Sequence, residues 1–485
     1  MASASIESST TERLESRIAR ATRGRSPALV RVEIAVSAWD PWRYLERACG
    51  GRGPWFAWSS RDGNQTFIAM GAVAHHEASG AEGWALSNRF CSDIREQSVA
   101  VGFEAHQTPS GTLPLVVGGL RFSTQESSEA RTPWAGWSSG ALWVPELVLM
   151  ERGGEGVACL TQAWSEAQEV GDLADSARER ARELERPPES GWLRHASRAP
   201  RRPSSEYEER VWSERVATAL KAIDEGTMDK VVLARAARFS AGAGEIFDVP
   251  NTLRALRRDQ PDCDVFAVGH PDGSVFLGAS PEPLLETRGR RAQTVALAGT
   301  VGRAGASEED EARVAQLLSS EKNGREHALV VDAIVEALEP LSDTLETAES
   351  AKVRTLTQVH HLETPIAATL ASNVGPVDVL EGLHPTPATC GWPKEAASAW
   401  IERHEGLDRG WYAGPVGWLN DAGDSRFCVA LRSALLRGDE AHAFSGAGLV
   451  TGSTPEGEWR ETEMKLQAIS QSLMTRPGLE NEGGA

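Results

Sequence analysis

One C-terminal stretch carries the most information, Gly457-Glu458-Trp459-Arg460-Glu461-Thr462-Glu463-Met464-Lys465, and it predicts a short helix. Spacings of three, four and seven residues place the side chains of Glu458, Glu461 and Lys465 on one flank of that helix. The next flank is apolar, which would seat the helix on a hydrophobic core. Its apolar residues are Leu466, Ile469 and Leu473. The helix is therefore expected to be anchored on one side while it presents charged groups beside the core.

Directly upstream, residues 443–450 predict a strand that contains the glycines Gly446 and Gly448. Glycines leave backbone N–H groups accessible, and the N-terminus of a helix favours negative charge, so the segment suits an anionic small molecule. A plain alternative is a glycine turn followed by a surface helix with an i,i+4 pair between Glu461 and Lys465. A Rossmann dinucleotide site is not expected, because the third glycine of that motif is missing.

The bulk composition excludes several classes of function. The chain has 485 residues and is 40% apolar, which allows a large core in two or three domains or in one large body. Its formal net charge of -19 argues against nucleic acid as a partner. No apolar run approaches the roughly 20 residues that cross a membrane, and no secretory signal is present, so we expect a cytoplasmic protein. The six cysteines form no CxxC pair and are expected to be reduced.

The chain is predicted to divide near residue 200. Residues 1–200 alternate short apolar runs with Gly-rich turns and predict sheet, followed by a charged and Pro-rich linker near 165–205. Residues 205–475 begin with a helix for which Ser205 and Glu208 predict a capping box. Further elements are expected as strands at 230–235, 265–268, 275–279 and 294–298 and as helices at 307–318 and 325–338. Because the strands come in clusters, antiparallel or mixed sheets are favoured over strict βαβ winding.

Four ionisable residues lie in separate segments where a plain strand or helix does not need them. Lys230 begins an apolar strand, and Glu282 lies in a turn between two prolines. Glu326 shares a helix face with apolar residues, and Arg432 follows another apolar strand. Each has an ordinary structural explanation, such as a lysine whose end reaches solvent or a surface ion pair. Together, they predict a functional site.

The motifs around these residues resemble those of the chorismate-utilising enzymes. The matching segments are 230–235, 280–282, 298–300, 326–327, 361–362, 383–388, 446–448 and 457–462. Within that family the chain resembles the isochorismate synthases, because members that insert ammonia typically have Gln where this chain has Lys230. The pair Pro387-Ala388 fits the same group. Thr389, Trp392 and Glu363 depart from the family pattern. These departures bear on which product the enzyme would form more than on its membership of the family.

The resemblance implies an α+β fold in which two large, mostly antiparallel β-sheets pack face to face with helices outside. Residues 1–200 would complete this fold, and residues 205–475 would form the chorismate-binding catalytic region. The implied reaction converts chorismate to isochorismate by Mg²⁺-dependent addition of water at C2 with loss of the C4 hydroxyl. Its product would feed menaquinone or siderophore biosynthesis, and the long N-terminal region favours menaquinone. We expect a monomer with a small-molecule substrate and with neither a nucleic-acid nor a membrane partner.

The resemblance also implies roles for individual residues. Lys230 would act in its neutral form as the base that activates water, and Glu282 would be the acid, protonated near neutral pH. Three carboxylates, Glu326, Glu461 and Glu458, would hold Mg²⁺, which neutralises the ring carboxylate of the substrate. Substrate contacts are implied for Gly299, Thr300, His361, Arg432, Gly446, Gly448 and Lys465.

These substrate contacts differ in purpose. Arg432, Lys465 and the glycine backbone would bind the second carboxylate of chorismate. Gly299 and Thr300 would line the ring, and His361 would contact the leaving hydroxyl. A core histidine with satisfied hydrogen bonds explains His361 equally well.

Three other functions stay open at the level of sequence. A salicylate synthase would use the same site and go on to eliminate pyruvate, so detection of pyruvate would reveal it. Ammonia-dependent formation of anthranilate or aminodeoxychorismate is disfavoured by Lys230. A catalytically silent chorismate-binding protein is disfavoured because candidates for every catalytic role are present.

Overall fold

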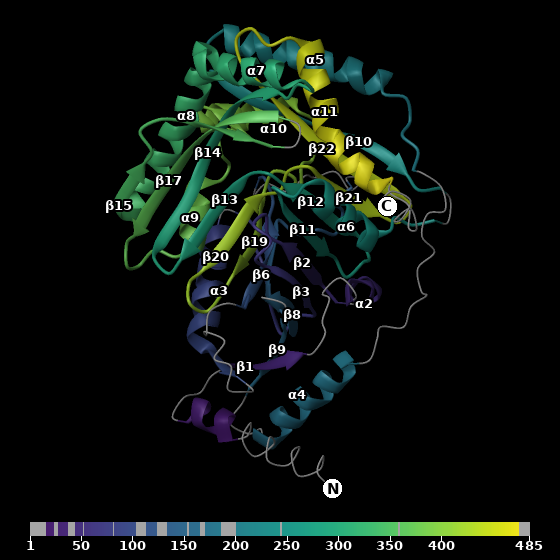
Figure 1. Ribbon diagram of the computed structural model, residues 1–485, viewed down its shortest axis with the longest axis vertical. Helices are drawn as coiled ribbons and strands as arrows, with labels where there is room; N and C mark the ends of the chain where they lie inside the picture. The colour runs from purple at the N-terminus through teal and green to yellow at the C-terminus, as the bar shows by residue number, and fades with distance from the viewer. Residues whose placement is uncertain are drawn as a thin grey trace.

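Two large, mostly antiparallel β-sheets form the body of the protein, and helices cover their outer faces (Figure 1). The computed structural model describes residues 16–23, 28–36, 44–51, 53–80, 82–102, 113–123, 133–152, 155–164, 170–185, 200–242, 245–356 and 359–474. No helix in these ranges is long and apolar enough to cross a membrane.

The larger sheet has 12 strands. In spatial order they are β18 (Gly391–Trp392), β10 (Lys230–Ser240), β22 (Glu440–Leu449), β21 (Ser433–Arg437), β12 (Val275–Ser280), β11 (Asp264–Gly269), β2 (Trp55–Ser59), β3 (Thr66–Met70), β8 (Leu147–Arg152), β9 (Glu155–Ala163), β1 (Leu29–Val36) and β5 (Ser98–Gly102). Strands β1 and β5 are parallel, and the other neighbours are antiparallel. The expected strands at 230–235, 265–268 and 275–279 lie within β10, β11 and β12.

The second sheet has 10 strands. Along its main path they are β15 (Ser342–Thr347), β17 (Val359–Leu370), β14 (Arg291–Gly302), β13 (Pro283–Arg288), β20 (Ser425–Val429), β19 (Pro415–Leu419), β6 (Val116–Leu120), β7 (Gly140–Val144) and β4 (Ala74–Glu77), while β16 (Lys352–Thr355) also pairs with β17. Its twelve-residue strands β14 and β17 run antiparallel along most of their length. They bring the segments around Thr300 and His361 together.

Both sheets continue across the expected linker. Strand β2 pairs with β11 in one sheet, and β6 pairs with β19 in the other. Much of the linker, residues 165–169 and 186–199, lies outside the described residues, as does the part of the N-terminus before residue 16. The charged helix expected in this region is α4 (Val170–Glu185). The division of the chain at residue 200 stays a prediction.

A hydrophobic core rich in aromatic side chains fills the space between the sheets. Its largest fully buried members include Trp58, Trp134, Trp143, Phe276 and Phe444. The rings of Trp134 and Phe444 stack with centroids 5.6 Å apart. Because burying aromatic rings removes large apolar areas from water, this layer is a main source of stability. It also forms one side of the cavity described below.

Helices pack on the outer faces of the two sheets (Figure 1). Helix α11 (Pro455–Leu473) lies on β22 and contacts α5 (Glu206–Asp224) and α6 (Val249–Asp259). Helix α8 (Glu321–Leu338) packs on β14. The other helical segments are α2 (Leu45–Gly50), α3 (Gly83–Gln97), α7 (Ser307–Ser319), α9 (Pro376–Leu383), α10 (Lys394–His404) and the 3-10 turn η2 (Glu339–Leu341).

Two local predictions about helix starts were wrong. The Ser205 side chain does not cap α5, and Glu208 forms an ion pair with Arg202 at 3.1 Å in place of a capping box. Helix α8 begins at Glu321, earlier than expected, because the Ser320 hydroxyl accepts a hydrogen bond from the backbone N–H of Asn323. The expected apolar flank of α11 was right: Leu466, Ile469 and Leu473 are all buried.

Candidate active site

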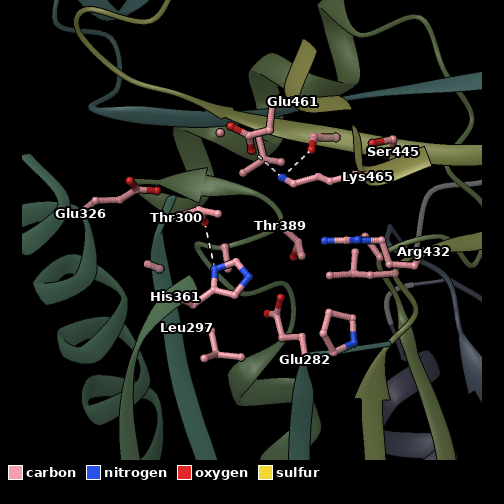
Figure 2. A pocket seen from close by; sticks show the side chains of 18 of the residues that line it. Glu282, Leu297, Thr300, Glu326, His361, Thr389, Arg432, Ser445, Glu461 and Lys465 are labelled. Carbon is pink, nitrogen blue, oxygen red and sulfur yellow. Dashed lines mark hydrogen bonds and ion pairs between the residues drawn. The ribbon is translucent and has the colours of Figure 1, made fainter. Parts of the chain in front are cut away.

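A cavity of about 200 Å³ lies where the ends of β10, β12, β14 and β22 meet helices α8 and α11. All of the residues that the sequence marked for the site line it. They are Lys230, Glu282, Gly299, Thr300, Glu326, His361, Arg432, Gly446, Gly448, Glu458, Glu461 and Lys465. Figure 2 shows Glu461 and Lys465 on one side of the cavity and Glu282 on the other, with His361 and Arg432 between them.

Helix α11 is fixed so that its charged flank faces this cavity. The Thr454 hydroxyl caps its N-terminus by accepting a hydrogen bond from Gly457 N–H at 3.2 Å. On β10, the buried Arg235 donates to the Thr462 hydroxyl at 2.8 Å, and its guanidinium lies 3.8 Å from the centre of the Trp459 ring. These contacts hold the turn of α11 that carries Glu461.

Lys465 is held from two sides. Its Nζ lies 2.6 Å from Glu461 Oε1 and donates to the carbonyl oxygen of Gly446 at 3.0 Å. The nearby lysine is the main cause that lowers the pKa of Glu461, so this carboxylate is ionised at neutral pH. The pair leaves a cation and an anion side by side at the cavity wall, as Figure 2 shows.

Lys230 is buried at the start of β10, and its Nζ donates to Glu326 Oε1 at 2.6 Å. The space that this pair occupies exists because residue 448 is a glycine. A Cβ at Gly448 would lie 3.2 Å from Lys230 Cε and 3.8 Å from Glu326 Oε1. The strand register explains why Gly448 lies next to Lys230, since Val232 pairs with Gly448 across β10 and β22.

Glu282 lies in the turn between β12 and β13. The Ser280 hydroxyl accepts a hydrogen bond from the backbone N–H of Glu282 at 3.2 Å. The same hydroxyl donates to the carbonyl of Val429 at 2.6 Å, and the two bonds fix the turn. Removal from water raises the pKa of Glu282 to about 7, while Lys230 and Lys465 act in the opposite direction. Glu282 can therefore carry a proton near neutral pH.

Arg432 enters the cavity from a strained backbone position. Its φ is 48°, and Ala413, which also lines the cavity, has a φ of 62°. Residues with side chains rarely adopt such angles, and they tend to occur at functional sites. Burial lowers the pKa of Arg432, whose usual value is so high that it stays charged. Among the described residues, its guanidinium forms no ion pair.

A bulge in β14 sets the side of the cavity that His361 lines. The register between β14 and β17 shifts at Gly299, where φ is 73°. Beyond the shift, Thr300 pairs with His361, and the Thr300 hydroxyl lies 2.9 Å from His361 Nδ1. Burial, followed by the nearby Arg432 and Lys465, lowers the pKa of His361 to about 3. The imidazole is therefore neutral near pH 7, and its role is limited to donating or accepting hydrogen bonds.

Several lining residues were missed by the sequence analysis as site residues. They are Val232, Pro281, Leu297, Ala298, Asn323, Ala388, Thr389, Arg409, Tyr412, Ala413, Leu431, Phe444, Ser445 and Val450. Thr389 stood out in the sequence as a departure from the family pattern, which was the available signal. Arg409 gave no signal, because its partner Glu405 is four residues away, the spacing of an ordinary surface pair.

The pair of Arg409 and Glu405 is buried at the wall of the cavity, with side chains 3% and 1% exposed. Two guanidinium nitrogens donate to the two carboxylate oxygens, each at 2.6 Å. Arg409 also donates to the carbonyls of Thr389 at 2.8 Å and Val232 at 2.7 Å. Glu405 accepts from the N–H of Ala234 at 2.8 Å. The pair thus ties the Thr389 loop to β10.

Comparison with known proteins identifies the family. Residues 16–474 match the family described as chorismate binding enzyme. The chain belongs to this family. The salicylate biosynthesis isochorismate synthase of Pseudomonas aeruginosa is 35% identical over 94% of this chain and 92% of that relative. The isochorismate synthase MenF of Bacillus subtilis is 31% identical over 86% of this chain and 87% of that relative.

The fold of this chorismate binding enzyme agrees with a solved member. The structure of MenF, the menaquinone-specific isochorismate synthase from Escherichia coli, superposes with a TM-score of 0.73 and 27% identity. The superposition covers 96% of this chain and 100% of that one. The expected α+β fold of two large antiparallel sheets is confirmed.

The carboxylates that line the cavity are candidate ligands for a divalent metal ion. Within the described residues, no group of three or more acidic, histidine or cysteine side chains is close enough to hold a metal. Glu326 and Glu461 line one cavity, but each is paired with a lysine. Mg²⁺ prefers oxygen ligands and commonly uses one or two carboxylates together with water and substrate oxygens. The donor set therefore fits Mg²⁺ bound together with substrate and water.

Proposed function

We propose that this protein is an isochorismate synthase, which converts chorismate to isochorismate. One observation carries the proposal: Lys230 and a Glu282 whose pKa is raised to about 7 line the same cavity. A displacement of hydroxyl by water needs a base for the incoming water and an acid for the leaving group, and a carboxyl group whose pKa is raised toward neutral pH suits the role of the acid. The relatives named isochorismate synthase support the same reaction.

The cavity also suits a substrate with two carboxylates. Lys465 and Arg432 supply two cationic side chains, and Arg432 has no ion-pair partner among the described residues. Guanidinium groups bind carboxylates through paired hydrogen bonds, so Arg432 is the residue proposed to orient one carboxylate of chorismate. The bare backbone at Gly446 and Gly448 lets the substrate approach β22 closely.

The proposed reaction balances as an exchange of one hydroxyl for another. A water oxygen bonds to C2 of chorismate, its proton passes to neutral Lys230, and the ring double bonds shift. The bond between C4 and its hydroxyl oxygen breaks as Glu282 donates a proton, so water leaves. Neutral His361 can hydrogen bond to the departing hydroxyl without competing for that proton, because its pKa is about 3. Return of the proton from Lys230 to Glu282 restores the site.

Glu326 and Glu461, with Glu458 close by on α11, are proposed to hold Mg²⁺ together with the substrate. When bound, the ion would neutralise the ring carboxylate, which three nearby glutamates would otherwise repel. In its neutral form Lys230 can still donate an N–H to Glu326, since the lone pair that would accept the proton of water is separate from that N–H. The same carboxylate is therefore shared between the proposed base and the proposed metal site.

Product analysis tests this function. Purified protein is incubated with chorismate and Mg²⁺, with and without ammonia, and the products are separated by chromatography while pyruvate is assayed. Isochorismate that forms without ammonia and without pyruvate is the expected result. Salicylate with pyruvate would identify a salicylate synthase, and an aminated product that needs ammonia would identify the third alternative. Absence of any product would leave a binding protein. Whether menaquinone or siderophore synthesis consumes the product stays a prediction.

A further inference from the structure

A second cavity, of about 220 Å³, lies between the sheets at the end of β11. Tryptophans form much of its wall, namely Trp137, Trp143 and Trp411. No described residue lines both this cavity and the catalytic one. An apolar cavity of about 150 Å³ is large enough to hold benzene. The second cavity therefore has room for one aromatic ring with a short substituent.

Two of the wall tryptophans are fixed in place before any ligand binds. The Trp137 N–H donates to the Ser274 hydroxyl at 2.9 Å, and the Trp411 N–H donates to the carbonyl of Ser138 at 3.1 Å. Their rings meet edge to face with centroids 5.2 Å apart. A wall held by hydrogen bonds and ring contacts keeps its shape, which lowers the entropy lost on binding.

The third tryptophan has an unsatisfied polar group. Trp143 is 1% exposed, and its indole N–H has no hydrogen-bond partner among the described residues. The three indole rings of the wall favour an aromatic guest over an aliphatic one, because contacts between aromatic rings add stability beyond the area they bury.

The side chains that line the cavity include one carboxylate, which bears on the charge of a guest. Glu77, exposed at the end of β4, lines the cavity, and no lysine or arginine is among the described residues that do so. His75 and His270 also line it, and His270 Nδ1 lies 2.8 Å from Asp272 Oδ1. A carboxylate beside aromatic faces attracts an organic cation. We propose that this cavity binds a small aromatic amine, with the ring among the three tryptophans and the ammonium group at Glu77.

A matched series of ligands tests the site by titration calorimetry: phenethylamine, phenethyl alcohol and phenylacetate share a ring and differ in charge. We expect the amine to bind more tightly than the alcohol by up to about fivefold, the upper limit for one exposed ion pair, and phenylacetate to bind most weakly. Glu77→Gln should remove the preference for the amine. Glu82→Gln, an equal change of charge at an exposed position outside the cavity, should keep it.

A cavity-filling variant locates the binding. Ala141 lines the cavity on the same face of β7 as Trp143, so Ala141→Phe should abolish binding of all three ligands while chorismate turnover is retained. Amine binding that survives Ala141→Phe in a folded protein would overturn the proposal, because the ligand would then lie elsewhere. Equal affinity for amine and alcohol would also overturn it. If Ala141→Phe does not fold, Glu77→Gln still tests the proposal, because Glu77 is exposed and the preference for the amine should be lost in that variant.

Discussion

Lys230 Nζ lies 2.6 Å from Glu326 Oε1, so the proposed base and a proposed metal ligand form one partly buried pair that joins β10 to α8. The two residues are far apart in sequence, and each borders the candidate active-site cavity. A change in the position or charge of one therefore acts on the other. This relationship underlies the first three predictions.

Removal of divalent metal should abolish turnover. With EDTA present, the carboxylates of Glu326 and Glu461 face the carboxylates of chorismate without a neutralising ion, and like charges repel. Addition of Mg²⁺ in excess should restore the rate, measured as isochorismate formed over time. Full activity in EDTA would show that the metal assignment is wrong.

Glu326→Gln should lose Mg²⁺-dependent activity and keep the fold. The amide oxygen of glutamine can still accept the hydrogen bond from Lys230, so the thermal unfolding midpoint should change little. Glu461→Gln should behave in the same way. Glu336→Gln, an exposed change on the same helix α8, is the control and should keep the wild-type dependence on Mg²⁺. Normal turnover by either site variant would remove that residue from the metal site.

Gly448→Ala should lower kcat without unfolding the protein. The added methyl group would lie 3.2 Å from Lys230 Cε, which pushes the lysine away from its position at the cavity. A displacement of ~1 Å can lower the rate by roughly 100-fold, and the contact at 3.2 Å requires only a few tenths of an ångström, so the loss in kcat should be smaller than that. Gly171→Ala, where nothing lies within 4 Å of the new Cβ, is the control and should leave kcat unchanged. An unchanged kcat for Gly448→Ala would argue against a role for the position of Lys230.

The rate should fall as pH rises through about 7. Glu282 acts as an acid only while protonated, and removal from water raises its pKa to about 7, so the active form is present below that pH and is lost above it. His361 does not contribute to this limb, because its pKa is lowered to about 3. The measurement is kcat against pH at saturating chorismate. In Glu282→Gln the fall near pH 7 should disappear, and kcat should drop by about 10² or more. A fall that persists in this variant would assign the limb to another group.

Glu405→Ala should destabilise the protein strongly. Its partner Arg409 is buried, and removal of one member of a buried pair leaves an uncompensated charge, which typically lowers the free energy of unfolding by about 3 to 5 kcal/mol. Urea unfolding measures the change. Glu225→Ala, which breaks the exposed pair with Lys221 at 3.8 Å, should change it by less than about 1 kcal/mol. Equal effects of the two substitutions would contradict the structural role of the Glu405–Arg409 pair.

The charged part of the site could be predicted from sequence because its residues interrupt apolar patterns. Lys230 begins an apolar strand and Glu282 lies between prolines, so their presence needs a chemical reason. The arrangement of the strands could not be predicted in this way, since alternation identifies a strand but not its neighbour. The pairing of Val265 with Ser59 joins residues about two hundred positions apart, and it depends on tertiary packing. The left-handed backbone of Arg432 likewise results from the surrounding structure.

The most direct test of the account compares Lys230→Gln with the wild-type protein. Initial rates of isochorismate formation are measured with saturating chorismate and Mg²⁺, and chorismate affinity is measured by calorimetry. Glutamine preserves a polar side chain at the start of β10 but cannot accept the proton of the attacking water. We predict near wild-type affinity and a rate lower by roughly 10² to 10⁴. Isochorismate formation at the wild-type rate by Lys230→Gln would contradict the assignment of Lys230 as the base.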